Sequence, residues 1–136
     1  MDKVFVDTDI ILDLLSARSP FYEFAANLFS LADKGSIKIS VSALSFANLN
    51  YILNKHLTPD QTRKKLQRFK TLVTVLPVND KVVDLALASD FKDFEDGIQY
   101  FTAIENNIKI LVTRNLKDFK SAEIPVLSAE SYLKSK

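Results

Sequence analysis

The stretch KVFVDTDIILDLLS, residues 3–16, places two acids between two apolar runs. Residues 3–6 are mostly β-branched or aromatic, which is typical of a short strand, and residues 10–15 form an apolar segment without a helix breaker. The pattern predicts a strand that ends at Asp7 and turns directly into a helix. Asp7 and Asp9 would then share the carboxyl end of the strand, where their like charges repel unless a positive group lies between them.

The composition is typical of one globular domain. The chain has 136 residues, 47% of them hydrophobic and only 2 of them glycine, and no repeat or linker divides it, so we expect a single domain over residues 1–136. No apolar run approaches the roughly 18 residues of a membrane span, and the N-terminal residues lack the pattern of a signal peptide. The absence of cysteine excludes disulfides and thiolate metal sites. We therefore expect a cytoplasmic location and no membrane partner.

The net charge of +1 conceals two oppositely charged segments. Residues 55–70 carry six basic side chains and one acid, whereas residues 80–96 carry six acids and two basic side chains. The net charge alone therefore indicates no class of partner. The basic segment predicts a helix with Lys64, Lys65 and Arg68 outward. Its basic side chains, Arg63, Lys64 and Arg68 among them, either contact a nucleic-acid backbone or are simply solvated.

Predicted strands alternate with predicted helices along the whole chain. The strands are expected at residues 3–6, 37–41, 74–78, 109–113 and 125–127. The helices are expected at residues 10–15, 21–32, 42–53, 58–71, 79–87, 93–105 and 128–133. This order predicts an α/β fold with a mainly parallel sheet covered by helices on both faces. In such folds, ligands bind beyond the carboxyl ends of the strands.

Several acids and amides are predicted to converge at that edge of the sheet. They come from four places: Asp7 with Asp9, Asn48, residues 93–96 and residues 113–118. Two carboxylates about 4 Å apart repel by roughly 4 kcal/mol at an effective dielectric constant near 20. A hard cation with oxygen ligands, Mg²⁺ or Mn²⁺, removes that repulsion and supports phosphodiester hydrolysis. The alternative for Asp7 is a helix cap, and the other acids are expected to be solvated, namely Asp13, Asp60, Asp84 and Asp90.

Two segments resemble the PIN-domain family. Residues 5–15, FVDTDIILDLL, are similar to the opening of that family, which has an apolar strand, then Asp-Thr-Asn or a close variant, then an apolar helix. Residues 93–119, DFEDGIQYFTAIENNIKILVTRNLKDF, are similar to its second half. The resemblance implies a three-layer α/β/α fold with a central, mainly parallel sheet of four to five strands. It also implies a metal-dependent ribonuclease, most often the toxin of a VapBC-type toxin–antitoxin pair. RNA, a small antitoxin protein and a second copy of the chain are the partners it implies.

The resemblance also implies a ligand set for Mg²⁺ or Mn²⁺. Asp7 matches the first acid of the family and Asp96 the third, while the fourth is either Asn115 or Asp118. The second acid, usually glutamate, is Asn48 within SALSFANLNYIL (residues 42–53). Asp9 stands where the family often has asparagine, so we infer that Asp9 partly restores the charge missing at Asn48.

The implied roles complete the predicted site. Asp7, Asp96 and Asp118 are the expected catalytic acids, with Asp9 as a further ligand, and Thr113 matches a hydroxyl that hydrogen-bonds to a metal-site carboxylate. Beside this site, Arg114 is expected to bind a phosphate of the substrate.

Two other functions are open from the sequence. A phosphatase of the haloacid-dehalogenase type would use Asp7 as a covalent nucleophile and Asp9 as a general acid. A PIN-like module that binds RNA or a protein without cutting is suggested by the loss of charge at Asn48.

Overall fold

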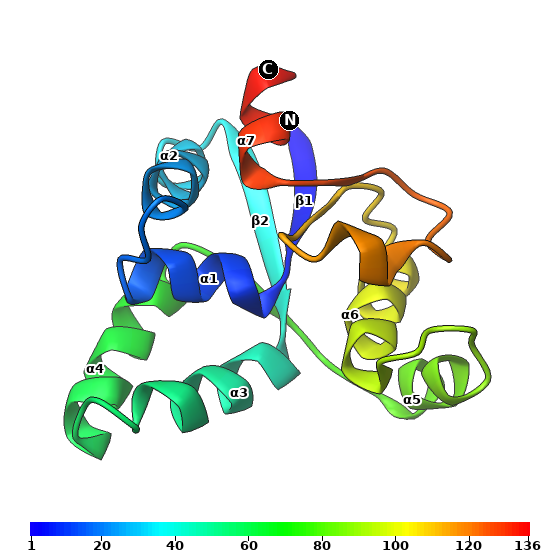
Figure 1. The fold of residues 1–136 in the computed structure, drawn as a ribbon, viewed down its shortest axis with the longest axis horizontal. Helices are drawn as coiled ribbons and strands as arrows, with labels where there is room; N and C mark the ends of the chain where they lie inside the picture. The colour runs from blue at the N-terminus through cyan, green and yellow to red at the C-terminus, as the bar shows by residue number, and fades with distance from the viewer.

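The computed structural model describes residues 1–136 and contains a five-stranded sheet in the order β3-β2-β1-β4-β5. Figure 1 labels two neighbouring strands of this sheet, β1 and β2. The strands are β1 (Asp2–Val6), β2 (Ile37–Ser42), β3 (Thr74–Leu76), β4 (Leu111–Val112) and β5 (Val126–Leu127). All four pairs of neighbouring strands are parallel. β1 is central, with Phe5 opposite Ser40 of β2 on one side and opposite Leu111 of β4 on the other. The predicted parallel α/β fold is confirmed.

Helices cover both faces of the sheet, which makes three layers. The helices are α1 (Thr8–Leu15), α2 (Tyr22–Asp33), α3 (Ala43–Leu53), α4 (Pro59–Lys70), α5 (Asp80–Leu87), α6 (Phe94–Glu105), the 3₁₀ helix η1 (Leu116–Phe119) and α7 (Ala129–Lys134). Buried residues of α1 to α4 and α7 share one hydrophobic core, whereas α6 and η1 pack on the opposite face. α5 packs against α6 on that second side (Figure 1). None of the helices is both long and apolar enough to cross a membrane.

The alternation of side chains along β1 separates the two cores. Val4 and Val6 lie in the larger core beneath α1 and α2, and Phe5 points to the other face, where it packs with Tyr100 and Ala103 of α6. All three β1 side chains are fully buried. The strand is therefore held from both faces, and it places Asp7 at a fixed point at the carboxyl edge of the sheet.

The helix boundaries follow capping signals in the sequence. Ser42, Thr58, Asn79 and Asp93 each accept a hydrogen bond from the backbone N–H three residues later. Thr58 and Gln61 form the complete capping box that the sequence predicts.

Three strands are shorter than the sequence predicts, and one helix was not predicted. β4 covers only two residues of the predicted strand 109–113, and β5 begins one residue later than predicted, because Pro125 has no N–H to extend the ladder between them. β3 ends at Leu76, directly before Pro77, for the same reason. The helix η1 lies in the segment between β4 and β5, where the sequence predicts no regular element.

Candidate active site

Asp7 lies at the carboxyl end of β1 and caps α1. Its Oδ1 accepts a 2.8 Å hydrogen bond from the N–H of Thr8, and its Oδ2 accepts one of 2.8 Å from the hydroxyl of Thr113, which follows β4. The side chain is 7% exposed. Both predictions for Asp7 are therefore compatible: the carboxylate caps the helix and also lies in a cluster of polar groups from distant parts of the chain. The hydroxyl of Thr113 thus contacts the carboxylate of Asp7, and its role in a metal site stays a prediction.

Asp9 lies beside Asp7, in the first turn of α1. Its Oδ2 accepts a 3.0 Å hydrogen bond from the backbone N–H of Arg114 and a 3.3 Å one from the hydroxyl of Thr113. Its Oδ1 is buried and has no hydrogen-bond partner. Because an unpaired buried carboxylate oxygen is unfavourable, this atom is the clearest candidate for binding a cation in the whole site.

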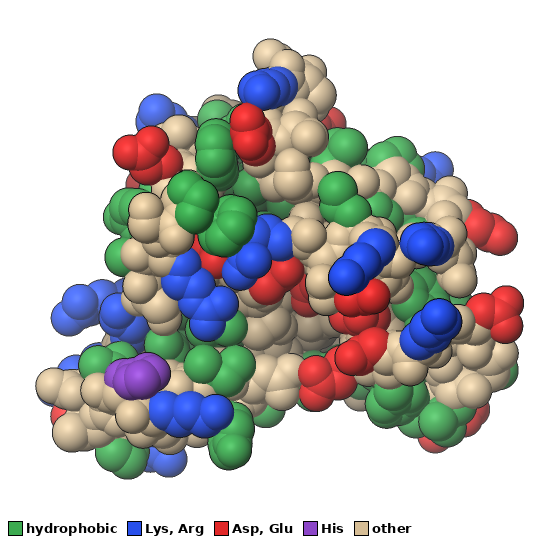
Figure 2. Space-filling model, viewed as in Figure 1, with side chains coloured by type: hydrophobic (Ala, Val, Ile, Leu, Met, Phe, Trp, Pro, Cys, Tyr) green, Lys and Arg blue, Asp and Glu red, His purple; other side chains and the backbone are tan.

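The predicted acids and amides meet in one pocket of about 420 Å³. Asp7 and Asp9 line it from the end of β1 and from α1, together with Asn48 of α3, Asp96 of α6 and Asn115 after β4. The convergence expected at the carboxyl edge of the sheet is therefore observed. Figure 2 shows acidic side chains grouped around a hollow near the centre of this face.

Asp118 lies outside this pocket. It is exposed and lines a neighbouring hollow of about 550 Å³ that shares Asp93 with the acidic pocket. Of the two candidates for the fourth position, Asn115 lines the acidic pocket together with Asp7 and Asp9, and Asp118 does not. The charge of Asp118 still reaches the site, because it is one of the charges that raise the pKa of Asp96.

Burial and mutual repulsion raise the pKa values of these acids. Burial, and then the charge of Asp9, raise the pKa of Asp7 to about 7, against the hydrogen bonds from Thr113 and Thr8 that lower it. Burial, followed by the charges of Asp93, Asp118 and Asp9, raises the pKa of Asp96 to about 7. Burial also raises the pKa of Asp9, and the N–H of Arg114 opposes that shift. The protein therefore holds three carboxylates where negative charge is unfavourable.

The donor set suits a hard divalent cation. All donors are oxygens, from the three acids and from the amides of Asn48 and Asn115, and the unpaired Asp9 Oδ1 is already buried beside them. No three acids, histidines or cysteines lie close enough together to hold a metal ion by themselves. Mg²⁺ usually keeps several water ligands and takes only one or two carboxylates, so it does not need such a group.

Gln99 is a site residue that was not predicted from the sequence. It is 2% exposed, lines the acidic pocket from α6, and donates hydrogen bonds of 2.9 Å to the Ser45 hydroxyl and 3.2 Å to the Thr8 hydroxyl. The hydroxyls of Thr8 and Ser45 are themselves 2.8 Å apart. The network ties α1, α3 and α6 together beneath the acids. An amide within the otherwise apolar run of residues 98–101 was the signal for it.

The prediction that Asp13 is solvated is wrong. The side chain is 1% exposed, and both of its oxygens accept hydrogen bonds from the Arg114 guanidinium, at 2.8 Å from Nε and 3.1 Å from Nη2. A fully buried acid requires such a partner. The guanidinium of Arg114, predicted to bind substrate, is thus already engaged.

The predicted basic helix is α4, and most of its basic side chains are outward. The prediction is wrong for Lys65, which is half-buried because its ammonium group donates a 2.6 Å hydrogen bond to the carbonyl of Leu15 at the end of α1. Arg63, Lys64 and Arg68 are exposed, and Lys64 pairs with Asp60 at 3.3 Å on the same helix. None of the three lines the acidic pocket. Their predicted contact with a nucleic-acid backbone stays a prediction.

Comparison with known proteins identifies the family. A family model described as PIN domain matches residues 3–117. Ribonuclease VapC1 of Aquifex aeolicus is 24% identical over 136 residues, which covers 96% of this chain and 93% of that protein.

Solved structures share the fold. FitAcB from Neisseria gonorrhoeae has a TM-score of 0.71 and 17% identity, covering 93% of this chain and 98% of that one. VapBC2 from Rickettsia felis, bound to a DNA fragment from its promoter, has a TM-score of 0.67 and 22% identity, covering 93% and 97%. VapC20 of Mycobacterium tuberculosis, a sarcin-ricin loop cleaving toxin, has a TM-score of 0.63 and 18% identity, covering 79% and 86%. Since the family model spans most of the chain, the protein belongs to the PIN-domain family.

Proposed function

We propose that this PIN-domain protein is a Mg²⁺- or Mn²⁺-dependent endoribonuclease and the toxin of a type II toxin–antitoxin pair. The observation that carries the proposal is the set of Asp7, Asp9 and Asp96 in one oxygen-lined pocket at the carboxyl edge of the sheet. The similarity to a protein named Ribonuclease VapC1, and to structures of toxin–antitoxin complexes, supports both parts of it.

The three acids would hold the cation, with Asn48 and Asn115 as neutral oxygen donors. Bound there, a divalent cation would polarise a phosphate and lower the pKa of a water molecule. The hydroxyl of Thr113 donates to both Asp7 and Asp9, which fixes their orientation and favours their ionised forms. Asp118, outside the pocket, would contribute negative charge near Asp96.

Cleavage of RNA by the purified protein tests the function. We expect structured or single-stranded RNA to be cut with Mn²⁺ or Mg²⁺ and to survive with EDTA. The control is Asp7→Ala, since cleavage that persists in it indicates a contaminating nuclease. Binding of RNA without any cutting in either metal contradicts the proposal and favours the non-cutting module that Asn48 suggests. The phosphatase alternative has no support from the family match.

The charge at Asp9 is expected to compensate for the amide at Asn48. Both side chains line the same pocket, so the charge of Asp9 and the amide oxygen of Asn48 would act on one cation. We expect Asp9→Asn to weaken Mn²⁺ affinity by at least about tenfold and Asn48→Glu to strengthen it, because ligand charge sets the affinity of carboxylate sites. Isothermal titration calorimetry measures both. Unchanged affinity in Asp9→Asn would show that the two departures from the family pattern are unrelated.

The partners follow from the same proposal. Complexes with antitoxins among the structural neighbours support a small antitoxin protein as a partner. A homodimer and a cytoplasmic location remain predictions from the sequence. Copurification with the product of an adjacent small gene, and the mass of the free protein by light scattering, are the measurements that check the partners.

A further inference from the structure

Arg114 connects two acids of α1 through different parts of its structure. Its backbone N–H donates a 3.0 Å hydrogen bond to Asp9 Oδ2, and its guanidinium makes the bidentate pair with Asp13. Asp9 and Asp13 are four residues apart in α1 and therefore lie on one face of the helix. One residue of the segment after β4 thus binds two successive turns of α1.

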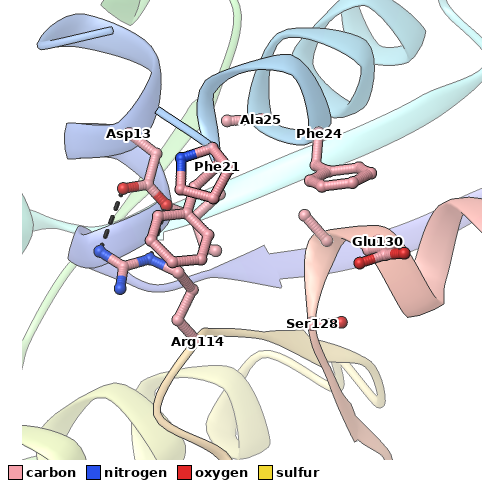
Figure 3. Close-up of a pocket in the computed structure, with 10 residues that line it drawn as sticks. Asp13, Phe21, Phe24, Ala25, Arg114, Ser128 and Glu130 are labelled. Carbon is pink, nitrogen blue, oxygen red and sulfur yellow. Dashed lines mark hydrogen bonds and ion pairs between the residues drawn. The ribbon is translucent and has the colours of Figure 1, made fainter. Parts of the chain in front are cut away.

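Besides its pair with Asp13, the guanidinium of Arg114 contacts the ring of Phe21. Its central carbon lies 4.1 Å from the centre of the Phe21 ring, between α1 and α2. Figure 3 shows the pair with Asp13 and the ring of Phe21 alongside the arginine. A bidentate pair with a buried acid and a stacked ring leave Arg114 little freedom to follow a substrate.

The confinement of Arg114 has a direct consequence for Asp9. The hydrogen bonds from Arg114 N–H and Thr113 both go to Oδ2, while Oδ1 is the buried oxygen without a partner. Holding Oδ2 against the segment after β4 fixes the direction in which Oδ1 points. Any movement of that segment away from α1 would release the Asp9 carboxylate.

We propose that Arg114 is a positioning residue, held by Asp13 and Phe21, that orients Asp9 for the cation and does not bind the substrate phosphate. The proposal rests on the proposed metal-dependent function. It replaces the role expected from the sequence, in which the guanidinium grips RNA. It also gives Asp13 a function in a site that it does not line.

Mn²⁺ affinity of the protein without RNA is the first test. Loss of a residue that orients a metal ligand typically costs 10- to 100-fold in metal affinity. We expect Asp13→Asn and Arg114→Gln each to weaken Mn²⁺ binding by at least about tenfold, and the double variant to be no weaker than either single one. Arg114→Lys should fail to restore affinity, because lysine keeps the charge but cannot pair bidentately with Asp13.

Cleavage kinetics separate positioning from substrate binding. We expect all three Arg114 and Asp13 variants to lose kcat at limiting Mn²⁺, to regain it at saturating Mn²⁺, and to keep the parent KM for RNA. The opposite pattern overturns the proposal. In that pattern Arg114→Gln raises the KM for RNA, Arg114→Lys restores the parent KM, and Asp13→Asn leaves the KM unchanged.

Further variants exclude misfolding and separate the two proposals. Since removing one partner of a buried ion pair can unfold a protein, Phe21→Leu is the safer change: the ring is 39% exposed, and its loss should weaken Mn²⁺ binding roughly two- to fivefold. Unchanged affinity in both Phe21→Leu and Arg114→Lys overturns the inference.

The matched control is Asp84→Asn, which changes an exposed acid on α5. If Asp96→Asn also leaves Mn²⁺ affinity unchanged, the metal site itself is refuted rather than the role of Arg114.

Discussion

Replacing Asp7 with asparagine is expected to abolish RNA cleavage and, without metal at pH 8, to raise the melting temperature. Activity should fall by at least about 100-fold, since even residues that only orient metal ligands cost 10- to 100-fold. Stability should rise because burial and Asp9 raise the pKa of Asp7 from 3.8 to about 7, so its charge is unfavourable in the folded state. At about 1.4 kcal/mol per pH unit, relief of half that shift gives about 2 kcal/mol, or roughly 5–10 °C.

Asparagine is suited to this test because it preserves the local hydrogen bonds. Its amide oxygen can accept from the Thr8 N–H, and its NH₂ group can donate to the Thr113 hydroxyl, so both contacts of Asp7 have equivalents. The measurements are single-turnover cleavage and thermal denaturation with EDTA, and Asp84→Asn is the control for a change of net charge. Lost activity with a lowered melting temperature would mean that Asp7 is needed for folding rather than for the cation.

Most of the fold could be predicted because its signals are local. Ser42, Thr58 and Asn79 cap helices within three residues of themselves, and the apolar runs of β1 and β2 need only their own residues to be recognised. The lengths of β3 and β4 could not be predicted in the same way. A strand lasts only as long as its neighbours offer hydrogen bonds, and β5, which limits β4, lies in a different part of the chain.

The site could be predicted from the sequence where a charged residue directly follows an apolar segment. Asp7 directly follows an apolar strand, and a carboxylate in that position requires polar or charged partners from elsewhere in the chain. Asp13 gave no such signal, because an acid on a helix is ordinarily solvated. Its partner Arg114 lies 101 residues away in the chain, and the amide of Gln99 meets Thr8 across 91 residues. Pairs of that separation are set by the packing of α1, α6 and the segment after β4, which no local pattern encodes.

The metal-free protein is expected to lose stability as the pH rises from 5 to 8, and divalent cations should reverse that trend. The folded protein keeps a proton on Asp7 up to about pH 7, whereas the unfolded chain loses it near 3.8. Between these values the folded state binds more protons, so the free energy of unfolding falls as the pH rises. Asp96, whose pKa is also raised to about 7, adds to the fall, but less, because solvent screens its more exposed carboxylate.

Cations should act most strongly where the acids are ionised. Mg²⁺ or Mn²⁺ that binds only the folded state stabilises it by mass action, about 2.7 kcal/mol at 100 times the dissociation constant. We therefore expect the cation to raise the melting temperature by several degrees at pH 8 and hardly at all at pH 5, where protons compete for the same oxygens. Differential scanning calorimetry at both pH values, with EDTA and with Mn²⁺, measures the four conditions. In Asp7→Asn the slope with pH should be shallower and the cation effect smaller. A metal-free melting temperature that stays level or rises from pH 5 to 8 would mean that the pKa values of Asp7 and Asp96 are not raised in solution. The repulsion between the acids, which is the electrostatic argument for a cation at this site, would then be refuted.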